Sequence, residues 1–501
     1  MKLKNILITL SLIGFIGSVH AQQKPNIVFI EVDDLPAHYT SILGQKNAKT
    51  PTIDKLAKEG IFFSNAVSQG TMCGPSRNSL ITGVYPHNIG FYQNGPFDGL
   101  ELNTWALPAA LQRAGYYTAH VGKSHIHPSE KGLKGSKVEK GREAHKRLGF
   151  DYVWQSLGRS VVGGKEPVRG KDAYVDFLLD NGYFEQMKKE RRKNSTLPTD
   201  VYLDGLYTKL ALEFMSNQKE QPFFLWLNYS VPHGPYDVAQ KYHDPFTKKM
   251  MPTPNYVEDP GTDIPALLRP YPMTDAHEIE KEQLGNFANI YYMDTQVNIV
   301  LNKIKELGKT DNTIIVFFSD HGILVGDHGL NHKSTLYKEV INPSLIVYDP
   351  RSNNNGRTVD TPVELQDILK TTMEWAGASK KDINTPYGES LAPLLQNKKG
   401  YTKTFAVAES PGYYTLVTKE YKYIAPFEYQ KDGFEVLFDL KKDPNEKTNI
   451  AKENPKVIKE FRLMAKEWLN NHGEVKIQAP MKPKKKKENK EKKAKKKKNK
   501  A

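Results

Sequence analysis

The sequence predicts an α/β protein with a mostly parallel central sheet and a smaller C-terminal subdomain. Short apolar runs rich in Val, Ile and Phe alternate with helical patterns through most of the chain, which is typical of parallel sheets. After about residue 380 this pattern gives way to consecutive short strand patterns. With 501 residues, 38% of them apolar, the chain can bury one large core or two smaller ones.

The first 21 residues have the form of a signal peptide. Lys2 and Lys4 precede the apolar run Ile6–Ile16, and small residues lead to an expected cleavage at Ala21-Gln22. The run is shorter than the roughly 20 residues that a membrane span needs, and no cysteine follows it for lipid attachment. We therefore expect export to the periplasm or the medium, with no membrane span.

Four predicted strands each lead into charged or ionisable side chains. The strands and the residues that follow them are Asn26–Val32 with Asp33 and Asp34, Tyr116–Val121 with Lys123 and His125, Pro222–Asn228 with His233, and Asn312–Phe318 with Asp320 and His321. In open parallel sheets ligands bind at the carboxyl ends of the strands. The sequence therefore predicts that these clusters converge on one site, although they lie far apart in the chain.

The C-terminal part of the body predicts an antiparallel sheet followed by a helix. The predicted strands are Thr404–Glu409, Tyr413–Thr418, Tyr421–Ala425 and Phe434–Leu440, joined by short polar turns. The helix carries an apolar stripe at helical spacing, made of Val457, Ile458, Phe461, Met464, Trp468 and Leu469. We interpret this stripe as core and not as a binding surface.

The net charge of +14 belongs to the termini and not to the folded body. Residues 481–501 contain thirteen Lys and two Glu, and without this tail and without Lys2 and Lys4 the charge is about +1. From Pro483 to Lys500 the tail lacks apolar residues to bury and should be disordered; it either contacts polyanions or is a solvated extension. A near-neutral exported body argues against a nucleic-acid partner. The single cysteine excludes an internal disulfide.

Three of the strand-end residues are carboxylates that suggest a cation site. Singly, Asp33, Asp34 and Asp320 are as typical of turns and helix caps as of metal sites. Together their repulsion would raise their pKa values unless a cation neutralised them. Oxygen-rich ligation favours Ca²⁺, with Mg²⁺ next, whereas zinc sites usually bring more His or Cys.

The lone cysteine, Cys73, stands in the string Cys73-Gly74-Pro75-Ser76-Arg77, before the helical stretch Asn78–Thr82. An isolated cysteine is usually a small buried hydrophobe. At a helix start, however, free backbone N–H groups favour an anion such as sulfate or phosphate. The string resembles the Cys-x-Pro-Ser-Arg signature of the type I, formylglycine-dependent sulfatases. Further blocks that resemble the family, in order, are Asn26–Asp34, Thr50–Gly60, Cys73–Pro86, Gly122–His125, Pro232–Pro235, Ser319–Lys333 and Asp439–Ile450.

The resemblance covers nearly the whole chain apart from the tail. It implies an alkaline-phosphatase-like α/β/α sandwich with a small antiparallel C-terminal sheet, which agrees with the pattern of strands. We therefore divide the chain into a signal peptide (1–21), a catalytic domain (22–380), a C-terminal subdomain (381–480) and a Lys-rich tail (481–501).

The resemblance also implies a set of site residues. Cys73 would be oxidised to formylglycine (3-oxoalanine) by a formylglycine-generating, sulfatase-maturing enzyme that recognises the signature. The implied roles are Ca²⁺ ligation by Asp33, Asp34, Asp320, His321 and residue 73; stabilisation of the hydrated aldehyde by Arg77; contact with that hydrate by Lys123 and His125, with His125 as base; and grip on the sulfate by His233 and Lys333, with His233 as general acid. Many relatives carry Asn where this chain has His321.

These features predict an exported sulfatase that acts on a sulfated polysaccharide or oligosaccharide. The polar, aromatic-rich segment 132–199 favours such substrates, with ulvan, carrageenan and glycosaminoglycans as the main classes. Two alternatives remain: a phosphodiesterase or phosphonate hydrolase of the same superfamily, and a non-catalytic glycan-binding relative. His127, His328 and His332 lie beside matched positions and receive no role.

Overall fold

The computed structural model describes residues 23–476 except 36, 96, 102–103, 164–165, 191–192, 219, 256–271, 380, 384 and 429–433. The predicted signal peptide and the Lys-rich tail lie outside these residues, so both stay predictions. So does the domain boundary predicted at residue 380.

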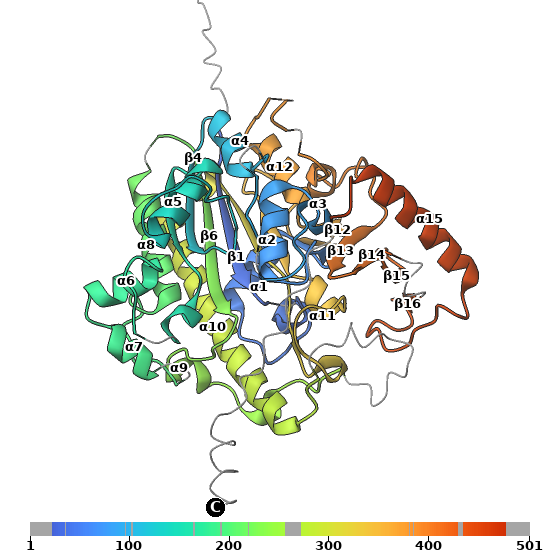
Figure 1. Ribbon diagram of the computed structural model, residues 1–501, viewed down its shortest axis with the longest axis horizontal. Coiled ribbons are helices and arrows are strands. Elements are labelled where there is room, and N and C mark those ends of the chain that lie inside the picture. The colour runs from blue at the N-terminus through green and yellow to red at the C-terminus, as the bar shows by residue number, and fades with distance from the viewer. Residues whose placement is uncertain are drawn as a thin grey trace, which may run out of the picture.

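An eight-stranded sheet forms the centre of the molecule (Figure 1), in the order β11-β2-β10-β7-β1-β6-β4-β5. Its strands are β1 (Asn26–Asp33), β2 (Ile61–Phe63), β4 (Tyr117–Lys123), β5 (Tyr152–Ser156), β6 (Phe223–Pro232), β7 (Thr313–Ser319), β10 (Leu345–Tyr348) and β11 (Arg357–Val359). Only β10 runs antiparallel to its neighbours. The predicted, mostly parallel sheet is confirmed.

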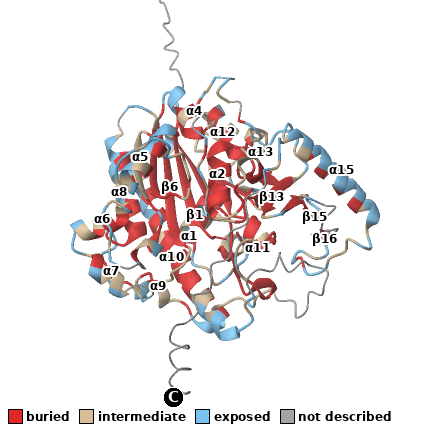
Figure 2. Cartoon of the chain, viewed as in Figure 1, coloured by how far each residue is buried: buried red, intermediate tan, exposed pale blue. Residues whose placement is uncertain are grey.

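Helices cover both faces of this sheet because its strands are apolar on both sides. In β1, Val28, Ile30 and Val32 pack on one face, while Ile27 and Phe29 pack on the other. The first face is covered by α1 (Pro51–Glu59), α8 (Leu203–Asn217) and α10 (Ala276–Glu306), and the second by α2 (Cys73–Thr82), α4 (Leu107–Arg113) and α12 (Asp367–Trp375). Figure 2 shows the buried strands between these layers.

The four strands predicted to carry the site are neighbours in the sheet. Val32 of β1 pairs with Ser319 of β7, Asp33 pairs with Pro232 of β6, and Asn228 of β6 pairs with Gly122 of β4. Their carboxyl ends therefore meet at one edge, as predicted. Strand β6 continues past the predicted end at Asn228, because buried Asp204 accepts hydrogen bonds from the backbone N–H groups of Ser230 and Val231.

The C-terminal sheet has four antiparallel strands, β13 (Ala406–Ser410), β14 (Tyr413–Val417), β15 (Tyr421–Pro426) and β16 (Val436–Asp439). Helix α15 (Pro455–Asn471) covers its outer face (Figure 1). Ile458, Phe461 and Trp468 of this helix are buried against the sheet, which confirms the predicted core stripe. The other face packs on residues 324–341 of the larger layer structure.

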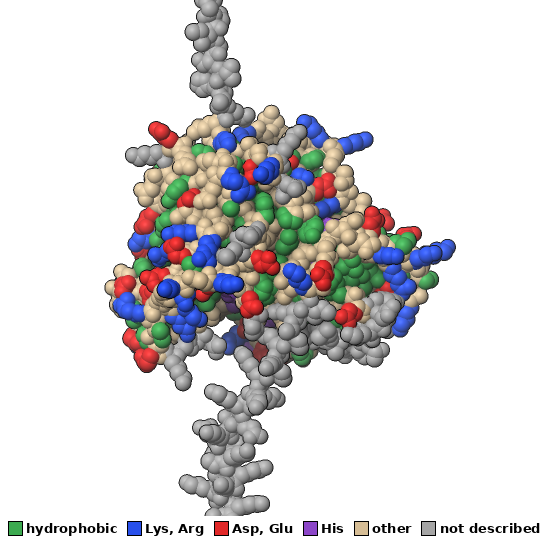
Figure 3. Space-filling view, turned by 45° about the horizontal axis from the view of Figure 1, so that its top comes forward, with side chains coloured by type: hydrophobic (Ala, Val, Ile, Leu, Met, Phe, Trp, Pro, Cys, Tyr) green, Lys and Arg blue, Asp and Glu red, His purple; other side chains and the backbone are tan. Residues whose placement is uncertain are grey.

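Between β4 and α8 the chain forms a lobe of short elements, α5 (Lys137–Arg147), η3 (Arg159–Gly163), α6 (Ala173–Asp180) and α7 (Phe184–Glu190). The remaining short elements are η1 (Ala37–Tyr39), η2 (Ser41–Leu43), β3 (Ala66–Val67), α3 (Pro86–Ile89), α9 (Gln240–His243), η4 (Lys248–Met250), η6 (Thr310–Asn312), β8 (Leu324–Val325), η7 (Asp327–Gly329), β9 (Asn331–His332), α11 (Lys338–Ile341), β12 (Val363–Glu364) and α13 (Ala392–Leu395). None of the helices in the described ranges is long and apolar enough to cross a bilayer. Acidic and basic side chains alternate over the surface seen in Figure 3, in keeping with a body of small net charge.

Candidate active site

Cys73 lies at the first residue of α2 and is 1% exposed, so its predicted place at a helix start is confirmed. Its thiol donates a hydrogen bond to Asp33 Oδ1 at 3.3 Å. Lys333 Nζ lies 3.0 Å and His321 Nε2 3.4 Å from its sulfur. The residue is thus surrounded by charged groups and is not packed as an inert hydrophobe.

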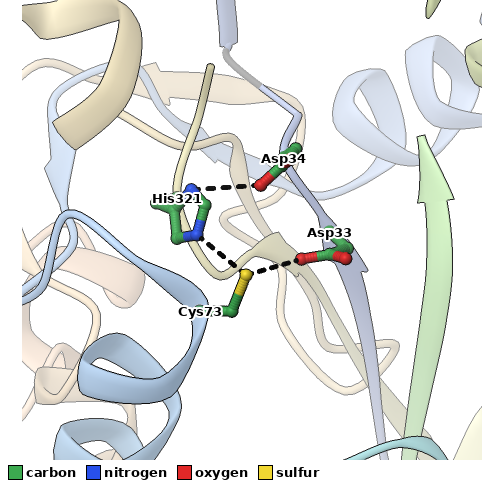
Figure 4. A group of neighbouring side chains, drawn as sticks. All are labelled: Asp33, Asp34, Cys73 and His321. Carbon is green, nitrogen blue, oxygen red and sulfur yellow. Dashed lines mark hydrogen bonds and ion pairs between the residues drawn. The ribbon is translucent and has the colours of Figure 1, made fainter. Parts of the chain in front are cut away.

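Asp33, Asp34, Cys73 and His321 form a compact group of ligand-type side chains (Figure 4). One potential ligand atom from each of the four lies within 4.8 Å of all the others. Asp34 turns toward the group from a left-handed backbone position, with φ of 67°. Because two buried carboxylates face one point, this donor set fits a divalent cation that prefers oxygen ligands.

Asp320 lies directly behind this group and joins it to Arg77. Its Oδ1 accepts hydrogen bonds from the backbone N–H groups of Asp34 at 3.3 Å and His321 at 2.9 Å, and its Oδ2 lies 2.9 Å from Arg77 Nε. Four of the five predicted metal ligands therefore gather directly, and the fifth contacts two of them. The ligand role of all five stays a prediction.

Arg77 is fully buried among three carboxylates. It lies 3.3 Å from Glu31, 3.8 Å from Asp33 and 2.9 Å from Asp320. Burial lowers the pKa of Arg77, but the three acids outweigh burial and raise this pKa, so the guanidinium stays charged. Burial raises the pKa of Glu31 to about 7 despite Arg77. Sequence reasoning missed Glu31, whose only signal is a charge inside an apolar strand.

Two lysines neutralise the aspartates at the centre of the site. Lys123 pairs with Asp33, and Lys333 Nζ lies 2.7 Å from Asp34 Oδ1. Burial raises the pKa values of Asp33 and Asp34, but these lysines together with His233 outweigh burial and lower both pKa values. In return, Asp33 raises the pKa of Lys123, and Asp34 that of Lys333, against the effect of burial. All four groups are therefore ionised at neutral pH.

The two candidate proton-transfer histidines are both partly exposed. His125 adopts a left-handed backbone with φ of 48°, and its carbonyl accepts a hydrogen bond from Asn78 at 3.0 Å. Burial and the charge of Lys123 hold the pKa of His125 well below its ordinary value, so its ring is neutral. The His233 side chain is 37% exposed, and its Nε2 lies 3.7 Å from Asp34 Oδ2. Protein around the rest of the ring lowers the pKa of His233 in spite of Asp34.

The backbone of His233 is held by residues that sequence reasoning missed. Arg159 Nη2 donates to the carbonyl of His233 at 2.6 Å, and Asn289 Nδ2 donates to it at 3.3 Å. Arg159 Nη1 also lies 2.7 Å from Asp237, and both side chains are almost fully buried. No motif marks these positions, because Arg159 comes from the lobe after β5 and Asn289 from the middle of α10.

The three histidines without a predicted role separate in space. His127 Nδ1 lies 3.2 Å from Asn78 Nδ2, next to His125. His328 stacks on Tyr337 at 3.7 Å and lies 3.2 Å from Glu339, so it belongs to a buried structural cluster. His332 is exposed on the short strand β9.

Family models match almost all of the described chain. A model described as Sulfatase matches residues 25–378, and one described as N-sulphoglucosamine sulphohydrolase, C-terminal, matches residues 326–472. A protein of Formosa agariphila named Sulfatase is 29% identical over 450 residues, which is 85% of this chain and 83% of that protein. An ulvan-active sulfatase of the same bacterium is 29% identical over 441 residues, or 85% of this chain and 77% of that protein.

The fold is also found among solved structures. The phosphonate monoester hydrolase of Agrobacterium radiobacter superposes with a TM-score of 0.73 at 19% identity, over 90% of this chain and 96% of that protein. A likeness at this identity bears on the fold alone. Together with the mixed central sheet and the C-terminal antiparallel sheet, it confirms the predicted alkaline-phosphatase-like architecture.

Proposed function

Because this chain belongs to the sulfatase family of sulfuric ester hydrolases, we propose that it hydrolyses sulfate esters of a sulfated polysaccharide or oligosaccharide, with a formylglycine derived from Cys73 and a bound Ca²⁺. The observation that carries the proposal is the surrounding of the Cys73 sulfur, which has Lys333 at 3.0 Å, Asp33 at 3.3 Å and His321 at 3.4 Å. A nucleophile at this point is held between cations that attract sulfate and carboxylates that hold a metal.

The thiol itself is the wrong nucleophile for this reaction, because a sulfated thiol has no second hydroxyl with which to expel sulfate. We propose that an oxidising maturing enzyme acts on Cys73, removing sulfur as sulfide and two electrons to leave an aldehyde. Hydration gives that aldehyde two hydroxyls on one carbon: one oxygen attacks the ester sulfur, and deprotonation of the other then releases sulfate and restores the aldehyde.

Asp33, Asp34 and His321 would hold the Ca²⁺, together with an oxygen of residue 73 and with Asp320. The chemistry supplied by the bound metal is stabilisation of negative charge on the attacking hydroxyl. Arg77 contributes positive charge next to Asp33 and Asp320, and its buried ion pairs keep these carboxylates in place. Calcium is favoured over magnesium because carboxylate oxygens dominate the donor set, and Ca²⁺ takes more oxygen ligands from the protein than Mg²⁺, which usually keeps several waters.

His233 and Lys333 act on the sulfate and on the leaving oxygen. Lys333 reaches Cys73, so its charge can pair with a sulfate bound there. The His233 ring is partly exposed beside Asp34, which leaves room for the leaving oxygen. A bound sulfate favours the protonated ring, since an anion nearby raises a histidine pKa. His233 then donates its proton as the S–O bond to the alcohol breaks.

His125 and Lys123 act on the residue 73 side of the reaction. The neutral ring of His125 can take the proton from the second hydroxyl, which allows sulfate to leave. Lys123 pairs with Asp33 and lies 3.9 Å from the Cys73 sulfur, so it neutralises charge on that side. Water then adds to the aldehyde and completes the hydrolysis.

The substrate class draws on the relatives and on the chain termini. One relative is an ulvan-active sulfatase, and the second family model is named for an enzyme of sulfated glucosamine. Export through residues 1–21 would bring the enzyme to such glycans outside the cell, and the Lys-rich tail could hold a polyanion near it. Ulvan, carrageenan and glycosaminoglycans are the substrates to screen.

One observation favours a second candidate, a phosphonate or phosphodiester hydrolase, because a phosphonate monoester hydrolase shares the fold. Assays on sulfate and phosphate esters of the same alcohol separate the two. We expect a higher kcat/KM for the sulfate ester. A clear preference for the phosphorus ester would favour the second candidate.

The decisive experiment is a screen of sulfated polysaccharides and their oligosaccharides, with released sulfate measured. The protein is produced with a maturing enzyme, and mass spectrometry verifies that the Cys73 peptide carries an aldehyde. Cys73→Ala, which cannot be matured, should release no sulfate from any substrate. Sulfate release by Cys73→Ala equal to the wild type would contradict the proposal, as would an aldehyde-bearing enzyme inactive on every sulfate ester.

A further inference from the structure

We propose that a cavity beside His125 binds a saccharide unit carrying a second anionic group, next to the unit whose sulfate is cleaved. This inference rests on the proposed sulfatase activity. The cavity has a volume of about 510 Å³ and lies at the carboxyl ends of β4 and β5, the same sheet edge as the catalytic site. Small-molecule sites commonly have volumes of about 300–1,000 Å³.

His125 connects this cavity to the catalytic centre. Its ring lines the cavity, and its Nδ1 atom is buried without a hydrogen-bond partner among the described residues. Leu157 also lines the cavity, and two residues further along the chain Arg159 holds the His233 carbonyl. A Cβ atom on Gly158 would lie 3.9 Å from Lys123 Cε. The cavity therefore adjoins both the proposed base and the support of the proposed acid.

Part of the cavity lining is polar and held by hydrogen bonds. The Ser124 hydroxyl lies 2.8 Å from His145 Nε2, and His145 Nδ1 lies 2.7 Å from the carbonyl of Gly141. His127 lines the cavity as well, with its ring held by Asn78 and packed against Phe91 at 5.1 Å. His127, which had no role in the sequence analysis, thus becomes a wall of the proposed subsite.

Two lysines in the lining of the cavity are available to pair with an anion. Lys137 and Lys171 both line it and are exposed. A hydrogen bond of 3.0 Å from the Val138 N–H to the Gly170 carbonyl brings their backbones side by side. No residue in the described part of the chain forms an ion pair with either lysine. Two adjacent positive charges repel each other, so an anionic group between them is stabilised.

The other features of the lining suit a sugar. Asp98 and Glu130 come from two segments joined by a hydrogen bond of 2.7 Å from the Leu100 N–H to the His127 carbonyl, and carboxylates accept hydrogen bonds from sugar hydroxyls. Leu157 is 52% exposed and offers an apolar surface to the face of a pyranose ring. The ligand class is therefore a hydroxyl-rich unit with one anionic substituent, a sulfate or a carboxylate.

The test compares Lys137→Ala/Lys171→Ala with the wild type, and uses Lys140→Ala on the same helix, which does not line the cavity, as the matched control. The substrates are a small aryl sulfate and three oligosaccharides whose neighbouring unit carries a sulfate, a carboxylate or only hydroxyls. The double variant should lower the ratio of kcat/KM for an anionic oligosaccharide to kcat/KM for the aryl sulfate by about tenfold. Lys140→Ala should keep the wild-type ratio. Comparison of the sulfated with the carboxylated oligosaccharide identifies which anion the subsite binds.

A ratio that stays within about twofold of wild type in both anionic arms overturns the subsite. A binding measurement keeps the test independent of turnover. In the Cys73→Ala background, the lysine double variant should raise the calorimetric Kd of the anionic oligosaccharide about tenfold, and an unchanged Kd overturns the subsite there too. Absence of sulfate release from all four substrates by matured wild type would instead overturn the proposed function.

Discussion

Arg159 should control the general acid without touching the substrate. Its guanidinium donates to the His233 carbonyl at 2.6 Å and pairs with Asp237 at 2.7 Å, and side-chain exposures of 1% and 2% exclude water from this pair. Arg159→Lys keeps the charge but loses the planar fork that serves both partners. We therefore expect His233 to lose its fixed position while the metal group and residue 73 remain in place.

The structure sets the size of the effect. Breaking a buried ion pair costs about 3–5 kcal/mol of unfolding free energy, so Arg159→Met tests stability, whereas Arg159→Lys retains part of the pair and tests catalysis. A shift of about 1 Å in a catalytic group lowers the rate about 100-fold. For Arg159→Lys we expect a fall in kcat of about that size on an alkyl sulfate, whose poor leaving group needs the proton.

The assay varies the leaving group. On a nitrophenyl sulfate, which leaves without much protonation, the same variant should lose about tenfold or less, and in a His233→Ala background it should cost little more on either substrate. The melting temperature of Arg159→Lys is measured in parallel. Two results would refute the positioning argument. One is an equal fall in kcat on alkyl and nitrophenyl sulfates. The other is a double variant whose fall in kcat is the full product of the two single falls.

Three further outcomes are expected. Chelation of divalent cations should abolish sulfate release, and Ca²⁺ should restore it better than Mg²⁺. Asp34→Asn should raise the Ca²⁺ concentration for half-maximal activity at least about tenfold. Activity that survives chelation would contradict the metal site. Burial raises the pKa of Glu339, but the contact with His328 outweighs burial and lowers the pKa from 4.5 to about 2. This carboxylate therefore stabilises the fold above pH 4.5 and loses its contribution as the pH falls toward 2. In urea unfolding at neutral pH, the unfolding free energy of Glu339→Gln should be about 3 kcal/mol below that of the wild type. This difference should shrink on acidification. Trp468→Ala, which removes a side chain packed on Tyr85 and Tyr414, should cost about 3–5 kcal/mol of unfolding free energy, and a loss below about 1 kcal/mol would mean that α15 adds little to the core.

The convergence of the site could be predicted because it follows from the topology of parallel strands. Apolar runs that end in Asp33, Lys123 and Asp320 identify the strands and their ends, and neighbouring parallel strands bring those ends to one edge. The local string around Cys73 was sufficient to predict its helix start. These inferences need only local patterns and one general rule of sheet geometry.

The supports of the site could not be predicted, because they depend on contacts between distant segments. Glu31 pairs with Arg77 from inside a strand whose other central residues are apolar. Arg159 and Asn289 meet at the His233 carbonyl from elements more than a hundred residues apart. Asp204 satisfies two backbone donors of β6 and so extends that strand beyond its apolar run. In each case a buried polar group finds its partner through the tertiary fold, which no local pattern encodes.

The histidines beside the matched positions show why adjacency in sequence is a poor guide to role. His332 and Lys333 are neighbours, yet Lys333 reaches Cys73 while His332, whose backbone is left-handed with φ of 66°, is exposed. His125 and His127 are two apart, and both line the same cavity. His328 lies between the metal group and Lys333 in the sequence, but its ring stacks on Tyr337 in the core. The backbone conformation at each position, and not its distance from the motif, decides which side chains reach the substrate.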